Sequence, residues 1–467
     1  MDKLLELILA LAIIGATLAF GGVQPLTYSL LEVVLFLALL MLLLRQTWQG
    51  KIALLLPIWP VLFAFLSVLQ LIPLPSRFIV TLSPMRQLGS TLAGLSDGKL
   101  IWTTLSISPH ETVLALLKFL AYSSAFLLAA YLFDSRKGKS TLVRGLIFLG
   151  CFEAAYGIVQ YLTGWQRIFT YTNPVNLDQA TGTYINHDHF AGLLELILPF
   201  VLGSGFYSFQ VWSERRQVGL DRRASAERSS AGIRTVFYLF LTAILGVAVI
   251  FSRSRGGILA TAFSLVFIVL LAQVKARRSA WMLGSFLFLV CVVGYGLWIG
   301  LNPVLARFEQ MREPGYLQME GRMAFWKDAL PLIRDYPLVG TGLGTFDTAF
   351  RRYQTARADA RVNHAHNDYL EFASDTGLLG VALLFLPILY LLAKMIISFL
   401  DDPRRYRRSI TLGCIGSSLA LLIHSMTDFN LQVPANALIF AVVLGIGYKA
   451  TCVERQGNGR KVDYPTA

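Results

Sequence analysis

The residues with the clearest chemical potential lie in one stretch, Asn363 to Gly380, which reads NHAHNDYLEFASDTGLLG. His366 and Asn367 are followed after nine residues by the glycines Gly377 and Gly380, where a long apolar run begins. A histidine side chain can take up or release a proton near neutral pH. Small residues just inside an apolar helix let it pack closely against a neighbour. The stretch therefore predicts an acid/base site at the edge of a membrane span.

Three other segments carry side chains that could bind an anion or move a proton. NHDHFAG at 186–192 precedes an apolar run, SRSRGG at 252–257 joins two apolar runs, and GR at 321–322 opens an amphipathic segment. The arginine fork matches phosphate oxygens with two parallel hydrogen bonds. A single member could instead be an arginine that reaches the membrane surface or an asparagine that caps a helix. With His364, the candidates are Asn186, His187, His189, Arg253, Arg255 and Arg322.

A histidine together with two or three arginines favours displacement of a lipid-linked diphosphate. The arginines would neutralise the leaving diphosphate, and the histidine would take the proton from an incoming hydroxyl group. A zinc hydrolase is a second alternative, because two HxH pairs could supply nitrogen ligands, although HExxH is absent: these are His187, His189, His364 and His366. A transporter is a third, because three glutamates lie within apolar runs, namely Glu32, Glu153 and Glu195.

The composition predicts the elements that must position these residues. Of 467 residues, 55% are apolar and 15% are charged, which is not a soluble globular composition. Apolar runs of about 17 to 25 residues recur, and each is long enough to cross a bilayer as a helix. We therefore expect an all-α polytopic membrane protein with about 12 transmembrane helices. The predicted spans lie near 4–21, 26–44, 52–73, 112–133, 141–162, 189–208, 235–252, 257–274, 280–300, 376–398, 409–427 and 434–450.

Basic residues set the predicted orientation. Arginine or lysine follows every even-numbered span, which places both termini and these loops in the cytoplasm. Such loops explain the net charge of +13 without a nucleic-acid partner. All six histidines then fall on the opposite, periplasmic side. We expect four regions: a membrane bundle at 1–300, a periplasmic loop with short amphipathic helices at 301–375, further membrane helices at 376–452 and a cytoplasmic tail at 453–467.

The stretch HNDYLEFASDTGLLG resembles the O-antigen ligase family, through its histidine-Asn pair, the nine residues that follow and its Gly-x-x-Gly. Neighbouring pieces are similar to the same superfamily in their order along the chain. They are GTYINHDHFAG, SRSRGG, the GR-x(3)-W motif at 321–326, GTGLGTF and HSMTDFNLQVP. The resemblance covers most of the chain. The superfamily also contains O-antigen polymerases and protein O-oligosaccharyltransferases.

This resemblance implies a metal-independent glycosyltransferase of the bacterial inner membrane that needs no cofactor. The donor would be an undecaprenyl-diphosphate-linked glycan, and the acceptor a hydroxyl group of a glycan, of lipid A core or of a protein. His366 resembles the catalytic base, and Arg255 and Arg322 resemble the diphosphate-binding arginines. The glycine spacing favours His366 over His364 as the base. Position alone places the remaining candidates near the pocket: Asn186, His187, His189, Arg253 and Asn367.

Overall fold

The computed structural model describes residues 1–50, 57–83, 85, 102–132, 136–173, 178–214, 222–276, 322–355 and 361–452. Helices dominate this part of the chain, and the strands in it are two short antiparallel pairs. β1 (Leu74–Pro75) pairs with β2 (Trp102–Thr103), and β3 (Arg167–Ile168) pairs with β4 (Tyr171–Thr172).

Eight helices in the described ranges are long and apolar enough to cross a membrane. They are α2 (Pro25–Trp48), α6 (Pro109–Leu132), α7 (Arg136–Thr163), α8 (His187–Glu214), α9 (Arg222–Phe251), α10 (Arg255–Ala276), α16 (Asp368–Asp401) and α18 (Pro434–Thr451). The prediction of an all-α polytopic membrane protein is therefore confirmed. Three more predicted spans coincide with α1 (Asp2–Leu18), α3 (Ile58–Leu71) and α17 (Arg405–His424). The predicted span at 280–300 lies outside the described residues.

Two helices begin well before their predicted apolar spans. α9 begins at Arg222 and α16 begins at Asp368, whereas the apolar runs begin near 235 and 376. The first two turns of α16 carry acidic side chains, yet Asp368, Glu371 and Asp375 are each at most 3% exposed. These turns lie inside protein rather than lipid, so an apolar run could not reveal them.

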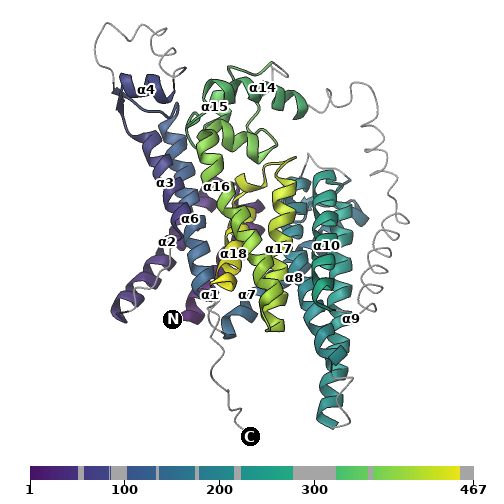
Figure 1. Ribbon diagram of the computed structural model, residues 1–467. Coiled ribbons are helices and arrows are strands. Elements are labelled where there is room, and N and C mark those ends of the chain that lie inside the picture. The colour runs from purple at the N-terminus through teal and green to yellow at the C-terminus, as the bar shows by residue number, and fades with distance from the viewer. Residues whose placement is uncertain are drawn as a thin grey trace.

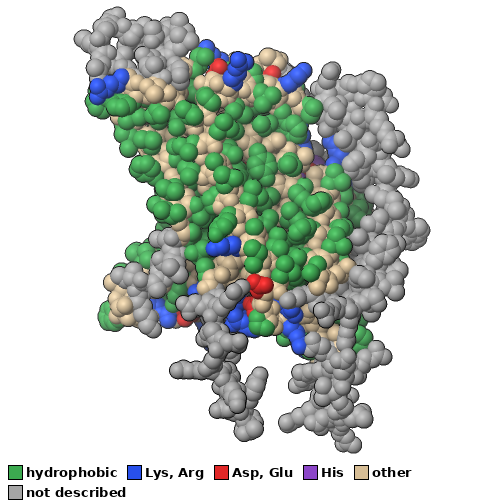
Figure 2. Space-filling view, in the orientation of Figure 1, with side chains coloured by type: hydrophobic (Ala, Val, Ile, Leu, Met, Phe, Trp, Pro, Cys, Tyr) green, Lys and Arg blue, Asp and Glu red, His purple; other side chains and the backbone are tan. Residues whose placement is uncertain are grey.

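α8 and α18 form the interior of the bundle. α8 packs against α7, α9, α10 and α17, and α18 packs against α6, α16 and α17 (Figure 1). Most residues of α8, α17 and α18 are buried, whereas the other six candidate spans expose apolar side chains. Figure 2 shows these side chains covering the middle of the molecule, with charged side chains gathered toward its two ends. An apolar band between charged ends is the surface expected of a protein that lies in a bilayer.

A small subdomain covers one end of the bundle. It contains α14 (Arg322–Asp335) and α15 (Phe346–Phe350), and it lies opposite the N-terminus (Figure 1). The aromatic rings of Phe346 and Phe350 stack at 4.8 Å and form its core with apolar residues of α14. Three shorter elements complete the fold: α4 (Ser76–Leu82) and the 3-10 helices η1 (Phe20–Gly22) and η3 (Asn430–Gln432).

Gly377 breaks the helical geometry of α16 where this subdomain meets the membrane bundle. Its φ is 65° and its ψ is −176°, so the helix is kinked there. The backbone amide of Leu378 donates to the Pro337 carbonyl oxygen at 2.8 Å, which joins the kink to the segment after α14. A side-chain carbon at Gly377 would lie 2.3 Å from backbone atoms of Leu338. The glycine thus permits a close approach to this backbone segment, whereas the sequence had suggested close packing against a neighbouring span.

Gly377→Ala is expected to lower the thermal stability of the purified protein in detergent. Alanine disfavours a positive φ, which costs about 1–3 kcal/mol, and its methyl group would also collide with the backbone of Leu338. Gly15→Ala is the matched control, because Gly15 is helical and nothing lies within 4 Å of an added carbon. Equal melting temperatures for the two variants would show that the kink at Gly377 is not required.

Candidate active site

The residue after His366 fixes its position at the start of α16. The side-chain oxygen of Asn367 accepts a hydrogen bond from the Leu370 amide at 3.1 Å and thereby caps the helix. The Asn367 side-chain amide also donates to the Met426 carbonyl oxygen at 2.9 Å. Met426 belongs to residues 424–431, between α17 and α18, which we call the polar turn. The cap therefore holds His366 beside the polar turn.

Asp428 of the polar turn is the carboxylate partner of His366. The distance from His366 Nδ1 to Asp428 Oδ1 is 3.2 Å, and the Asp428 side chain is completely buried. Burial acts to raise the pKa of Asp428, but the neighbouring His189 and the hydrogen bond with His366 outweigh it and hold the pKa below its ordinary value. A carboxylate at Nδ1 orients the imidazole ring and stabilises its protonated form, and it leaves Nε2 for another proton partner.

Arg322, at the start of α14, links the polar turn to α8. Its guanidinium group donates to the Thr427 carbonyl oxygen at 2.9 Å and to the Asp188 carboxylate at 2.8 Å. Burial alone would lower the pKa of Arg322, but the Asp188 carboxylate raises it above the ordinary value. Since Thr427 is adjacent to Asp428, the arginine and the His366 pair belong to one network.

Asp188 also connects this network to the SRSRGG segment. The Ser254 hydroxyl group donates to the Asp188 carboxylate at 2.6 Å. Ser254 lies between the two predicted arginines, and Arg255 is the first residue of α10. The Arg253 side chain lies over the ring of Tyr161 at 5.5 Å, so its guanidinium is directed toward α7. The segment is thus anchored at the site through Ser254.

Phe429 is surrounded by three of the predicted histidines. The His364 ring stacks on it at 4.1 Å, and the rings of His189 and His366 meet it edge-on at 4.7 and 4.8 Å. His189 Nε2 also lies 3.5 Å from the second carboxylate oxygen of Asp428. One histidine of the first HxH pair and both histidines of the second therefore meet at one aromatic side chain, although nearly two hundred residues separate the two pairs in the sequence.

The environment of His364 differs from that of His366. His364 Nδ1 lies 2.8 Å from Glu371 Oε1, and the other carboxylate oxygen of Glu371 accepts from the Ala365 amide at 2.9 Å. Burial acts to lower the pKa of His364, but the charge and hydrogen bond of Glu371 outweigh it and raise the pKa above its ordinary value. His364 is therefore protonated to higher pH than an ordinary histidine.

Glu371→Gln is expected to lower stability at acidic pH more than at alkaline pH. Because the pKa of His364 is raised on folding, the pair stabilises the fold fully below a pH of about 6.5, and this is lost as pH rises through the raised value. The effect is at most about 1 kcal/mol, since 35% of the His364 side chain is exposed. Melting temperatures across pH would test this, and a deficit that grows with pH would contradict it. In a His364→Gln background the pH dependence should disappear.

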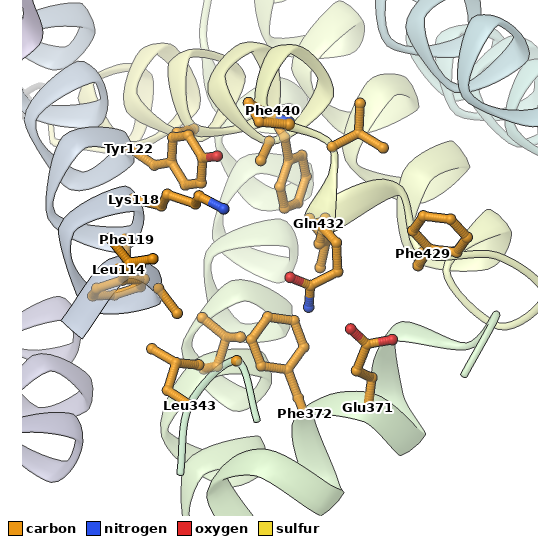
Figure 3. Close-up of a pocket in the computed structure, with 18 of the residues that line it drawn as sticks. Leu114, Lys118, Phe119, Tyr122, Leu343, Glu371, Phe372, Phe429, Gln432 and Phe440 are labelled. Atoms are coloured by element: carbon orange, nitrogen blue, oxygen red, sulfur yellow. The ribbon is translucent and has the colours of Figure 1, made fainter. Parts of the chain in front are cut away.

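Phe429 is also part of the wall of a cavity of about 540 Å³. His189, His364, Glu371 and Phe429 are among its lining residues, whereas His366 and Arg322 are not among those described. The polar lining residues include an ion pair between Asp347 and Arg361. Apolar residues of α3, α6, α16 and α18 line the rest; they include Phe63, Phe119, Phe126, Phe372, Phe440 and Leu444. Figure 3 shows Leu343, Glu371 and Phe372 across the cavity from Tyr122.

The remaining predicted residues lie at the start of α8. The Asn186 side chain accepts from the Asp188 amide at 2.9 Å and so closes the turn that begins the helix. His187 Nδ1 lies 3.5 Å from the Asp188 carboxylate. Among the described residues, no three His, Cys, Asp or Glu side chains are grouped to hold a metal ion. Three of the four histidines, His189, His364 and His366, thus contact Phe429, whereas His187 lies beside Asp188.

Two of the glutamates in apolar runs hold neighbouring helices together. Glu195 of α8 lies 3.1 Å from His424 Nδ1 at the end of α17, and both side chains are buried. Glu153 of α7 accepts hydrogen bonds from the amide and hydroxyl groups of Thr183 at 2.9 and 2.7 Å. These contacts fix α7, α8 and the polar turn relative to one another, which is a structural use of the buried carboxylates.

The comparison with known families bears on the same region. Residues 240–385 match the model of a family described as O-antigen ligase. This match supports a place for the chain in the O-antigen ligase-like superfamily. The eight candidate spans among the described residues make this a multi-pass membrane protein, and the match supports an enzyme of the ligase or glycosyltransferase type in general. The matched range contains Arg255, Arg322 and His366, while Asp428 and the polar turn follow it. A search of curated proteins found no match.

Sequence reasoning missed the acidic and aromatic partners of the site. Asp188 and Asp428 organise the arginine and histidine contacts, Glu371 pairs with His364, and Phe429 joins the histidines. All four stand in motifs that the resemblance had quoted for other reasons: Asp188 in NHDHFAG, Glu371 in HNDYLEFASDTGLLG, and Asp428 and Phe429 in HSMTDFNLQVP. An acidic residue inside a polar motif between apolar runs was the available signal.

Proposed function

We propose that the protein transfers a glycan from an undecaprenyl-diphosphate-linked donor to an acceptor hydroxyl group on the periplasmic side of the bacterial inner membrane. The observation that supports this most directly is the single network of His366, Asp428, Arg322 and Asp188. In this network a histidine oriented by Asp428 and a half-buried arginine contact adjacent residues of the polar turn. These are the two kinds of group that the displacement of a diphosphate requires.

His366 is the proposed general base. The acceptor oxygen forms a bond to the anomeric carbon of the donor sugar while its proton passes to His366 Nε2. The bond between that carbon and the diphosphate oxygen breaks, and undecaprenyl diphosphate leaves with the electron pair. Asp428 stabilises the protonated imidazole, because its carboxylate contacts Nδ1 at 3.2 Å and is buried.

His364 is less suited to this role, although it also contacts a carboxylate. Glu371 raises the pKa of His364, so a larger fraction of it is protonated near neutral pH and unable to accept a proton. A protonated His364 would instead contribute positive charge beside Phe429. The preference for His366 therefore rests on the glycine spacing and on its contact with Asp428, next to the residue that Arg322 contacts.

The proposed role of the arginines is to neutralise the leaving diphosphate. Arg322 keeps its charge, and contacts with Asp188 and Thr427 orient its guanidinium while 28% of the side chain stays exposed. Arg255 stands at the amino end of α10, where the helix dipole also favours an anion. Arg253 lies over Tyr161 and is the least direct candidate of the three. Substrate contacts of Asn186, His187, His189 and Asn367 remain part of the proposal.

A transfer assay with purified protein tests the proposed function. A labelled undecaprenyl-diphosphate glycan would be offered with three acceptors: lipid A core, the same glycan and a protein with exposed serines. We expect transfer that persists in the presence of a metal chelator, and the labelled product identifies the acceptor class. The absence of transfer to every acceptor, together with movement of the glycan or of protons across liposomes, would instead support a transporter.

A further inference from the structure

The Asp428 carboxylate has a second oxygen that the proposed mechanism does not use. Its Oδ1 contacts His366, whereas its Oδ2 lies 3.5 Å from Nε2 of His189. Both Oδ2 and this Nε2 are buried, and neither has a hydrogen-bond partner among the described residues. A buried polar atom without a partner is costly, and most such atoms in folded proteins are satisfied. The two atoms are therefore each other's expected partner.

Two contacts keep the His189 ring beside Asp428. The carbonyl oxygen of His189, in the first turn of α8, accepts a hydrogen bond from the side-chain amide of Asn436 of α18 at 2.9 Å. The ring meets Phe429 edge-on at 4.7 Å. A shift of about 0.5 Å would then bring Nε2 into hydrogen-bond range of Asp428 Oδ2. Contacts of this kind often tighten when a substrate binds.

A donor at Oδ2 changes what Asp428 does to His366. Such a donor favours the ionised form of the carboxylate and draws negative charge away from Oδ1. Without it, Asp428 would take up a proton more readily, and while ionised it would hold the protonated form of His366 more strongly. Both changes raise the pH that is needed for a neutral, oriented His366. A base must be neutral to accept a proton, so the donor widens the working range of the site toward acid.

We propose that His189 is a positioning residue for the base: it donates from Nε2 to Asp428 and thereby sets the pH above which His366 is neutral. This role acts through Asp428 and is separate from a contact with substrate. The assignment of His366 as the base rests on the proposed function, whereas the effect of His189 on the protonation of His366 does not.

Other charged side chains face this group from each neighbouring element. They are Asp188 and Glu195 of α8, Arg322 of α14, His364 before α16 and His424 at the end of α17. Each belongs to an ion pair of its own: Arg322 with Asp188, His424 with Glu195 and His364 with Glu371. A substitution at His189 breaks none of these pairs, so its effect on His366 is expected to pass through Asp428.

The test measures the protonation of His366 directly, in the full chain in detergent and without donor or acceptor. Diethyl pyrocarbonate acylates a neutral imidazole and not a protonated one. The rate of modification of His366 as a function of pH therefore gives a midpoint. Mass spectrometry of the chymotryptic peptide, fragmented between the two histidines, separates His366 from His364.

Three substitutions of His189 separate the donor from the bulk of the ring. His189→Met removes the donor, and we expect the His366 midpoint to rise by about one pH unit, a tenfold change in proton affinity. His189→Gln should keep the wild-type midpoint, because its amide nitrogen can take the place of Nε2. The amide of His189→Asn ends one bond short, so this variant should behave like His189→Met. His110, exposed at the start of α6, is the internal control, and its midpoint should be the same in every protein.

The pH dependence of glycan transfer gives the second measurement. The acid limb of kcat/KM should move with the His366 midpoint, so that His189→Met is slow near neutral pH and recovers at higher pH. An unchanged His366 midpoint in folded His189→Met and His189→Asn would overturn the proposal. Equal shifts in His189→Met and His189→Gln would also overturn it, because both lose the ring contact with Phe429. A shifted midpoint in a protein that transfers no glycan would support the role of His189 and contradict the proposed function instead.

Discussion

His366→Ala is expected to abolish glycan transfer while the protein remains folded in the membrane. A positioned general base contributes about 10²–10⁴-fold to the rate, and alanine also removes the group that Asp428 orients. The measurement is the initial rate with a labelled lipid-diphosphate glycan, after size-exclusion chromatography has shown that wild type and variant are equally folded. A residual rate about 100-fold or more below wild type would agree with the role of base.

Two other histidine substitutions make this experiment specific. His364→Ala should weaken transfer without abolishing it, because His364 contributes charge and stacking but not the proton acceptor. His110→Ala should leave the rate unchanged, since His110 is exposed at the start of α6 and away from Phe429. Equal losses from His364→Ala and His366→Ala, or normal transfer without His366, would remove the basis for assigning His366 as the base.

Hydropathy located the helices well because the lipid-facing sides of most spans are continuous apolar surfaces. It failed at the start of α16, where the chain enters protein rather than lipid. There the buried Asp368 carboxylate accepts hydrogen bonds from the Ser425 hydroxyl group at 2.7 Å and the Leu431 amide at 3.1 Å. These two hydrogen bonds to one carboxyl oxygen tie the start of α16 to the polar turn, and no local pattern predicts partners about sixty residues away.

In the candidate site, too, the sequence revealed residues with a recognisable chemistry but not the residues that contact them. Histidine and arginine could be recognised from the sequence because each suggests a chemistry by itself. Asp188 and Asp428 acquire their roles only through contacts among α8, α14 and the polar turn. A single-sequence reading cannot pair such residues, because the pairing depends on how distant helices pack. Gly377 is a related case, since its partner is the backbone of Leu338 and not an adjacent span.

Arg322→Lys is expected to reduce transfer strongly although the positive charge is retained. The guanidinium group contacts the Thr427 carbonyl oxygen and the Asp188 carboxylate at once, and the single ammonium group of lysine lacks this planar fork. Losing one hydrogen bond to a charged group corresponds to about a 10–100-fold effect. The loss should fall on both kcat and the KM for the donor, because the proposed arginine contact is to the diphosphate in the bound and reacting states.

Lysine is the informative replacement, because an uncharged side chain would leave the buried Asp188 carboxylate without its arginine partner and destabilise the fold. Arg351→Lys is the matched control: Arg351 belongs to the same subdomain, but 59% of its side chain is exposed and its contact with Asp347 is 3.6 Å long. We expect this control to transfer glycan at the wild-type rate. If Arg322→Lys did so too, a positive charge at this position would be sufficient, and the proposed geometric recognition of the diphosphate by Arg322 would be wrong.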